Sequence, residues 1–317
     1  MSSFQLDIEH ANGQTRLISA SAFKNACGKA LLDLGLGLCM SLCLLAGITS
    51  QAWAGDKLLA TGGVMQIEGA GGGGLVPWAL ISGYGTQDQV GGSVFYTRAE
   101  TRSGLDLASA GVAVGIHNRV ELSMNQIQFG MGEVVPGLTI KLNTLGAKVR
   151  LFGDAIYEQD NYTPQVSVGL QYKHNEDFGL AKAIGAKDNS GVDYYLAASK
   201  LYLGAIAGRN LLLNATLQAT KANLFGIAGF GGDKNNQYRL QPQVSAALML
   251  TDSLFVGAEY RARPDNLKSF KEDDAKDIFI AWFPHKNVSI TAAYVDLGNL
   301  ATDGDQTAWY LSGQISY

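Results

Sequence analysis

Alternation of apolar and polar residues with a period of two dominates this sequence after residue 55. In residues 165–173, valine, leucine and tyrosine alternate with glutamine, serine, glycine and lysine, and residues 211–220 repeat the pattern with leucine and alanine. Successive side chains of a β-strand point to opposite faces, so each stretch predicts a strand with one apolar and one polar face. Helical periodicity is absent apart from a short turn predicted at 180–186.

Further stretches with the same period complete a series of predicted strands. The clearer ones are residues 145–151, 244–250, 254–263, 288–295 and 308–317. Weaker ones are residues 62–69, 75–83, 90–99, 105–116, 120–129, 192–202 and 277–283. About 10 residues is the length that a tilted strand needs to cross a membrane, and most of these stretches approach it.

The last predicted strand ends on an aromatic residue and has one apolar face. Trp309, Leu311, Ile315 and Tyr317 share that face. Bacterial outer-membrane barrels end in the same way, and we expect this strand to close a barrel by pairing with the first strand and to engage the barrel-assembly machinery. The last strand of a soluble sandwich is the alternative.

The predicted connections alternate in length. Tight polar turns at 117–119, 208–210, 251–253 and 285–287 alternate with long loops at 173–191, 221–237, 264–276 and 296–306. This asymmetry is typical of outer-membrane barrels, with short periplasmic turns and long external loops. The prediction is an all-β fold, a transmembrane antiparallel up-and-down β-barrel of 14 strands. A 12-stranded barrel that holds residues 55–83 as an N-terminal plug is the alternative. The connection at 153–164 departs from the alternation of short turns and long loops, because it is long where a short turn is expected.

The N-terminal region has the features of an export signal. Lys24 and Lys29 precede a 15-residue apolar run at 34–48, and Ala52-Trp53-Ala54 matches an A-x-A cleavage site. We therefore assign residues 1–54 to an N-terminal extension and cleaved signal peptide, and 55–317 to the barrel. All three cysteines precede residue 55. The expected location is the outer membrane, with its lipid and lipopolysaccharide as partners.

Composition narrows the classes of function. Charged residues make up 16% of the chain and the formal net charge is −4 without a basic cluster, which argues against nucleic acid. Gly69, Gly71 and Gly74 match G-x-G-x-x-G, a pattern that binds nucleotides where a helix follows it. Here a strand-like run with Pro77 follows, so the hinge of a hatch is preferred to a nucleotide site. No metal-ligand spacing or nucleophile motif is present, and we expect neither a cofactor nor an enzyme.

Charged residues at polar positions of the predicted strands are candidates for the lining of a lumen. These are Lys148, Arg150, Lys173, Glu259, Arg261 and Arg263, with Glu121 as a further acidic member. If they line one pore, the lumen is mildly basic and favours small anionic solutes that cross by passive diffusion. An ion-paired network that fills the barrel is the competing interpretation.

Two other functions stay open. One is transport of hydrophobic compounds past an N-terminal hatch at residues 69–74. The other is hydrolysis at the external rim, for which His174 is the only histidine in a suitable loop position.

Three segments carry a family resemblance. They are GDKLLATGGVMQIEGAGGGGLVPWALISGYG, AGRNLLLNATLQATKANLFGIAGFGGD and VGAEYRARPDNL. Together they resemble a proteobacterial outer-membrane β-barrel family of unknown function, porin-like and uncharacterised, over residues 55–317. The resemblance implies an outer-membrane location and no particular catalytic or binding residues.

Overall fold

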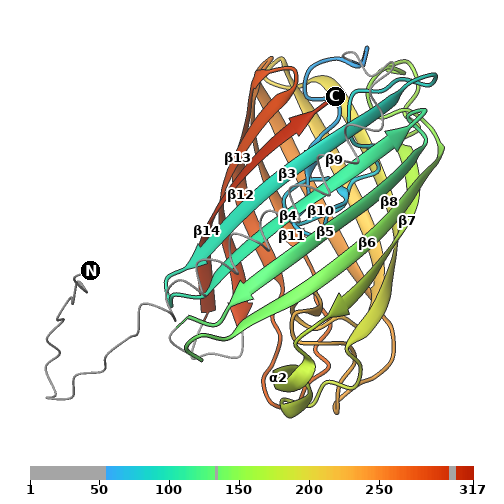
Figure 1. Ribbon diagram of the computed structural model, residues 1–317. Coiled ribbons are helices and arrows are strands. Elements are labelled where there is room, and N and C mark those ends of the chain that lie inside the picture. Colours follow the sequence, from blue (N-terminus) through green and yellow to red (C-terminus); the bar gives the residue numbers. More distant parts are fainter. Residues whose placement is uncertain (1–54, 133–134, 300–304) are drawn as a thin grey trace, which may run out of the picture. The chain divides into compact units, whose positions relative to one another are not determined.

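The computed structural model describes residues 55–132, 135–299 and 305–317, so the predicted export signal and the three cysteines lie outside the described residues. Within these ranges, twelve antiparallel strands form a closed barrel (Figure 1). None of the helices in these ranges is long and apolar enough to cross a membrane.

The wall strands follow one another around the barrel in chain order. They are β3 (Val90–Thr101), β4 (Asp106–Ile116), β5 (Val120–Gly130), β6 (Thr139–Phe152), β7 (Gln165–Asn175), β8 (Ser190–Ile206), β9 (Arg209–Thr220), β10 (Arg239–Thr251), β11 (Leu254–Arg261), β12 (Ala275–His285), β13 (Val288–Asn299) and β14 (Asp305–Ser316).

The barrel closes between its last and first wall strands. Strand β14 pairs with β13 on one side and with β3 on the other, in a register that runs from Ala308↔Thr101 to Ser316↔Ser93. Because both edges are paired, no strand in the wall is left with a free row of backbone donors and acceptors. The all-β, up-and-down barrel predicted from the sequence is confirmed.

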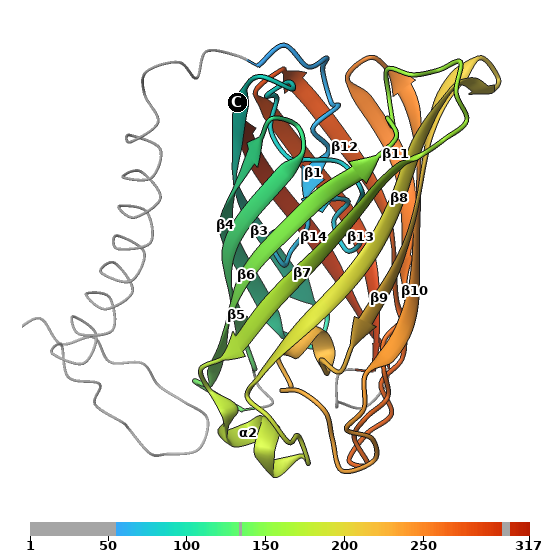
Figure 2. The same cartoon turned by 90° about the vertical axis from the view of Figure 1, so that its right-hand side faces the viewer.

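The count of 14 strands is wrong, and the alternative of 12 strands with an N-terminal plug is confirmed. Of the segment predicted as two more strands, only β1 (Val64–Met65) and β2 (Gly71–Gly72) have strand structure, and they pair with each other and not with the wall. Figure 2 shows this segment inside the barrel. Every residue from Gly62 to Gly85 is buried. A wall strand needs one face toward lipid, and this segment has none. We call residues 62–85 the plug.

The two ends of the barrel differ in their connections. Short turns follow β4, β8, β10 and β12 at the end that holds Tyr317, whereas the loops with α2 (Phe178–Ala183) and η1 (Leu224–Gly226) lie at the opposite end, here called the loop end (Figures 1 and 2). The long connection at 153–164 lies at the Tyr317 end. Its carbonyls at Asp154 and Glu158 accept hydrogen bonds from Lys200 Nζ at 3.0 and 2.6 Å, which ties the connection to β8.

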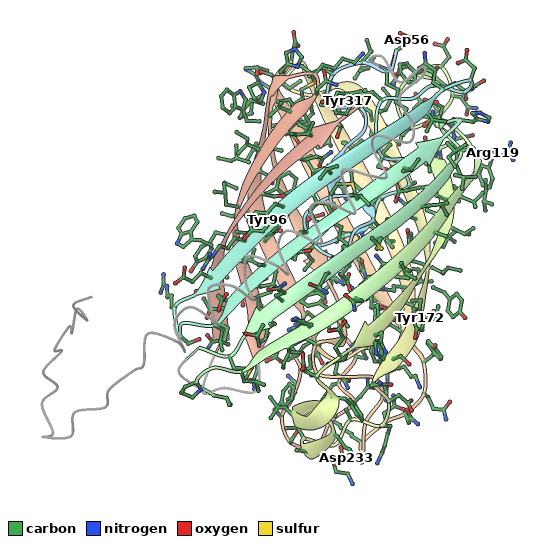
Figure 3. The ribbon with its side chains drawn as sticks, in the orientation of Figure 1. Asp56, Tyr96, Arg119, Tyr172, Asp233 and Tyr317 are labelled. Carbon is green, nitrogen blue, oxygen red and sulfur yellow. The ribbon has the colours of Figure 1, made fainter. Side chains whose placement is uncertain are left out.

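The outer surface of the wall is apolar. Figure 3 labels Tyr96 and Tyr172, which lie on this surface with many aliphatic neighbours. Exposed large apolar side chains from most wall strands include Leu122, Leu145, Leu170, Leu196, Leu217, Ile278, Ile280, Trp282, Trp309, Leu311, Ile315 and Tyr317. Trp78, by contrast, lies in the plug and is 5% exposed. A band of this kind suits a hydrocarbon environment, as in outer-membrane barrels.

Leu311 tests this view of the outer surface. It lies midway along β14, points outward and is 59% exposed. Leu311→Arg should lower the free energy of unfolding in lipid vesicles by about 2–4 kcal/mol, because it places a charge in hydrocarbon. Leu58→Arg is the control, since Leu58 is 61% exposed but precedes the wall. Equal, small effects of both changes in urea titrations would show that lipid does not surround β14.

Candidate functional site

Much of the inner face of the wall is polar, and most of these polar side chains contact the plug. Buried inward-facing residues include Ser93, Thr97, Ser109, Glu121, Asn125, Lys148, Ser167, Lys173, Asp193, Ser199, Thr216, Gln218, Ser245, Glu259, Arg261 and Asp277. Buried polar groups need hydrogen-bond partners, and here the partners come largely from the plug. The candidate functional site is therefore the interface between plug and wall.

Glu68 of the plug lies at the centre of the buried ionic network. Its carboxylate is fully buried and forms ion pairs with Lys173 of β7 and Arg261 of β11. Gln66 Nε2 donates a third hydrogen bond to Glu68 Oε2 at 2.8 Å. Lys173 Nζ also pairs with Asp193 at 2.5 Å. One plug residue thus joins two wall strands that β8, β9 and β10 separate.

Two wall glutamates bind backbone amides of the plug. Glu121 accepts hydrogen bonds from the amides of Gly71 (2.9 Å) and Ser82 (2.8 Å), and Glu259 accepts one from the amide of Leu75 (2.7 Å). Lys148 Nζ pairs with Glu121 at 3.0 Å and donates to the carbonyl oxygen of Gly71 at 2.8 Å. The plug has little regular secondary structure, so these side chains satisfy backbone groups that would otherwise be buried without partners.

The predicted hinge glycines all lie in the plug. Gly69 has φ +91°, a conformation that favours glycine. A Cβ atom on Gly71 would lie 2.7 Å from Glu121 Oε2, and one on Gly73 would lie 1.9 Å from Glu259 Oε1. Gly74 has room for a Cβ, with its nearest neighbour at 3.5 Å. Gly71 and Gly73 therefore allow the wall carboxylates to approach the backbone, while a hinge at Gly69, Gly71 and Gly74 stays a prediction.

Several wall residues that the sequence did not single out also hold the plug. Trp78 Nε1 donates to Ser245 Oγ at 2.9 Å. The amide of Ala79 donates to Ser199 Oγ at 2.9 Å, and its carbonyl oxygen accepts from Ser167 Oγ at 2.6 Å. Serines on alternate positions of predicted strands were the available signal, but serine is equally common on water-facing surfaces.

Arg150 and Arg263 lie near the two ends of the barrel and do not contact the plug by hydrogen bonds. Arg150 donates to the carbonyl oxygen of Gly153 and pairs with Asp154 at 3.0 Å in the long connection. Arg263 follows β11 and donates to the carbonyl oxygen of Leu297 at 2.5 Å. The six predicted lining residues thus divide into four that meet the plug and two that fix connections.

The wall has no excess of basic charge around the plug. Lys148, Lys173 and Arg261 face inward, but so do four acidic side chains: Glu121, Asp193, Glu259 and Asp277. Asp193 and Asp277 were absent from the predicted lining. With both included, the charges of the described wall residues give no reason to favour anions.

Residues 222–230, between β9 and β10, fold into the loop end of the barrel, and we call them the lid. All nine are buried. The amide of Leu224 donates to Glu272 Oε1 at 2.9 Å, and Asn175 Nδ2 donates to the carbonyl oxygen of Ile227 at 2.6 Å. The ring of Phe225 lies 4.6 Å from the guanidinium of Arg261 and 5.3 Å from that of Arg263. The lid and the plug therefore block the lumen in series.

The described residues give no support to a rim hydrolase. His174 lies near the loop end of β7 on the side opposite Lys173, and within the described ranges no side-chain hydrogen bond joins its ring to a serine. Among the same residues, no group of three or more His, Cys, Asp or Glu side chains is placed to hold a metal ion.

The closed wall, apolar outside and polar inside, defines a barrel of the outer-membrane type with its own plug. The chain belongs to DUF3034, a family described as a protein of unknown function, whose model matches residues 61–314. No curated protein is similar to the chain in sequence.

The chain is similar, at low identity, to several solved outer-membrane proteins. The KdgM porin is 10% identical with a TM-score of 0.44, over 71% of this chain and 99% of that one. The COG4313 outer membrane channel from Pseudomonas putida F1 is 10% identical with a TM-score of 0.42, over 76% and 97%. Omp33 of Acinetobacter baumannii is 12% identical with a TM-score of 0.40, over 73% and 100%.

Glu68→Gln should destabilise the folded barrel strongly. It leaves Lys173 and Arg261 buried with less compensating charge, and breaking such a pair reduces stability by about 3–5 kcal/mol. Lys276→Gln is the control, because Lys276 is exposed and its pair with Asp296 is worth about 0–1 kcal/mol. Urea unfolding in vesicles measures both. A Glu68→Gln barrel as stable as the control would contradict the ionic network.

The attachment of the lid should depend on pH through Glu272. Burial raises the pKa of this carboxyl to about 7, although Arg263 opposes the shift. The folded state then binds a proton more tightly than the open state, so lid stability falls as pH rises from about 4.5 to 7. Between pH 5 and pH 8, opening at the Leu224 amide should increase on the order of tens of times.

Hydrogen exchange, corrected for its intrinsic pH dependence, measures this opening. Glu272→Gln keeps an acceptor for the Leu224 amide but does not titrate, so its corrected opening should be the same at both pH values. A wild-type lid with no pH dependence would show that Glu272 does not hold it.

Proposed function

We propose that this chain is a plugged outer-membrane channel, porin-like in its wall, that admits small solutes by passive diffusion when the plug moves. The observation that carries the proposal is the polar inner wall. Its charged and hydroxyl side chains bind plug backbone atoms that water could replace. In a barrel with an apolar interior, water could not replace the plug in this way, because an apolar lumen would not hold a water column.

The proposal places the barrel in the membrane through its apolar outer surface, with the short turns in the periplasm and the loop end outside. Strand β14 would be the part that engages the barrel-assembly machinery, and the outer wall would contact lipid and lipopolysaccharide. No anion preference is included, because inward acidic and basic side chains are balanced.

Conductance in planar bilayers tests the proposal. The wild-type chain from residue 55 should conduct rarely, whereas a barrel without residues 62–83 should conduct more often, because only the lid then obstructs the lumen. A deletion variant that keeps its strand content but conducts no more often than the wild type would contradict the channel.

A disulfide gives a matched test without deletion. Ala79→Cys with Ser199→Cys joins the plug to β8 where the Ala79 amide now donates to Ser199 Oγ. The oxidised form should abolish the rare openings, and reduction should restore them. If the oxidised barrel conducts like the reduced one, the plug does not gate the lumen.

A further inference from the structure

A cavity of about 40 Å³ lies where the plug, the wall and the lid meet. The plug contributes Leu75, the lid contributes Leu224 and Phe225, and the wall contributes Leu107, Phe129 and Ala308 among others. The surface of this cavity is almost entirely apolar. It therefore differs from the parts of the lumen where hydroxyl, amide and charged groups hold the plug, and it is separate from the packing of Phe279 and Phe283 of β12 in the apolar cluster between wall and plug.

The inner wall changes character toward the loop end. Ser109 of β4 and Asn125 of β5 bind the plug. Nearer the loop end, the inward-facing positions hold apolar residues instead: Leu107 is one inward position from Ser109, and Phe129 is two from Asn125. Part of this apolar surface packs against the lid, which explains why it is apolar. The packing is incomplete, however, and the cavity is the space that lid, wall and plug leave between them.

Water has little reason to occupy this space. A buried water needs two to four polar partners, and dry apolar cavities bind xenon or small hydrocarbons instead. An apolar occupant would gain dispersion contacts that the cavity lining lacks when empty. We propose that this cavity is a binding site for small apolar molecules, covered on its outer side by the lid.

The lid has a backbone that suits a movable cover. Leu224 and Phe225 have φ values of 45° and 65°, which are unfavourable for residues with a side chain. Such conformations persist only where the surroundings enforce them, and here Glu272 and the guanidinium of Arg261 do so. Movement of the lid would enlarge the cavity and connect it to the loop end, so molecules larger than the closed space could enter.

This inference rests on the proposed channel function only for the route by which a bound molecule would cross the membrane. Binding in the cavity is separate from conduction, and the two can fail independently. A barrel that binds xenon but never conducts would support the binding site and contradict the channel. A barrel that conducts but binds no xenon would support the channel and contradict the binding site.

Crystals of the barrel pressurised with xenon test the site. Xenon should occupy the cavity between Leu107, Phe129 and Leu224. Ala308→Val should exclude it, because Ala308 lines the cavity and the added methyl groups fill it. Ala293→Val is the matched control: Ala293 is a buried, inward-facing alanine on β13 that does not line the cavity, so xenon should still bind. Ordered water in the wild-type cavity, or no xenon there, would overturn the proposal.

Toluene in detergent solution tests the same site with a larger probe, which requires the lid to move. It should raise the melting temperature of the wild type and of Ala293→Val relative to that of Ala308→Val. Equal shifts for all three proteins would show that toluene acts through the detergent or the outer wall, and would contradict a site beneath the lid.

Discussion

Mutual satisfaction of buried polar groups is the constraint on which this structure depends. The inner wall carries carboxylates and cations that would be expensive to bury alone, and the plug carries backbone amides and carbonyls with few partners of their own. Glu121 and Lys148 bind the backbone of Gly71 in β2, and Glu68 meets Lys173 and Arg261. The wall and the plug therefore stabilise each other through these contacts.

This arrangement separates two kinds of barrier along one lumen. The plug is held by hydrogen bonds and ion pairs as well as by apolar packing against the wall. The lid is held largely by apolar packing, with the buried carboxyl of Glu272 at its edge. The cavity lies between them, at the point where the polar wall gives way to the apolar one. A solute would therefore meet an apolar region first and a polar region second as it enters from the loop end.

The wall could be predicted from the sequence because each wall strand has lipid on one side, and this preserves the period of two. The plug could be predicted only as an alternative to two further wall strands, since residues 62–69 and 75–83 alternate weakly but are buried on both faces. The sequence does not identify Asp193 and Asp277 as inward-facing, because they lie at the ends of weakly patterned stretches. Arg150 and Arg263 fix connections, and their positions depend on contacts between distant segments that no local pattern encodes. The same holds for the fold of the lid.

The exchange rates of three plug amides in lipid vesicles test the central claim most directly. The amides of Gly71, Leu75 and Ser82 donate to the buried carboxylates of Glu121 and Glu259. Our account predicts that they exchange with solvent far more slowly than the amide of Tyr162, a residue that is 83% exposed, and that Glu121→Gln speeds exchange at Gly71 and Ser82 more than at Leu75. Rates like those of an unstructured peptide at all three amides would contradict a plug bound within the barrel.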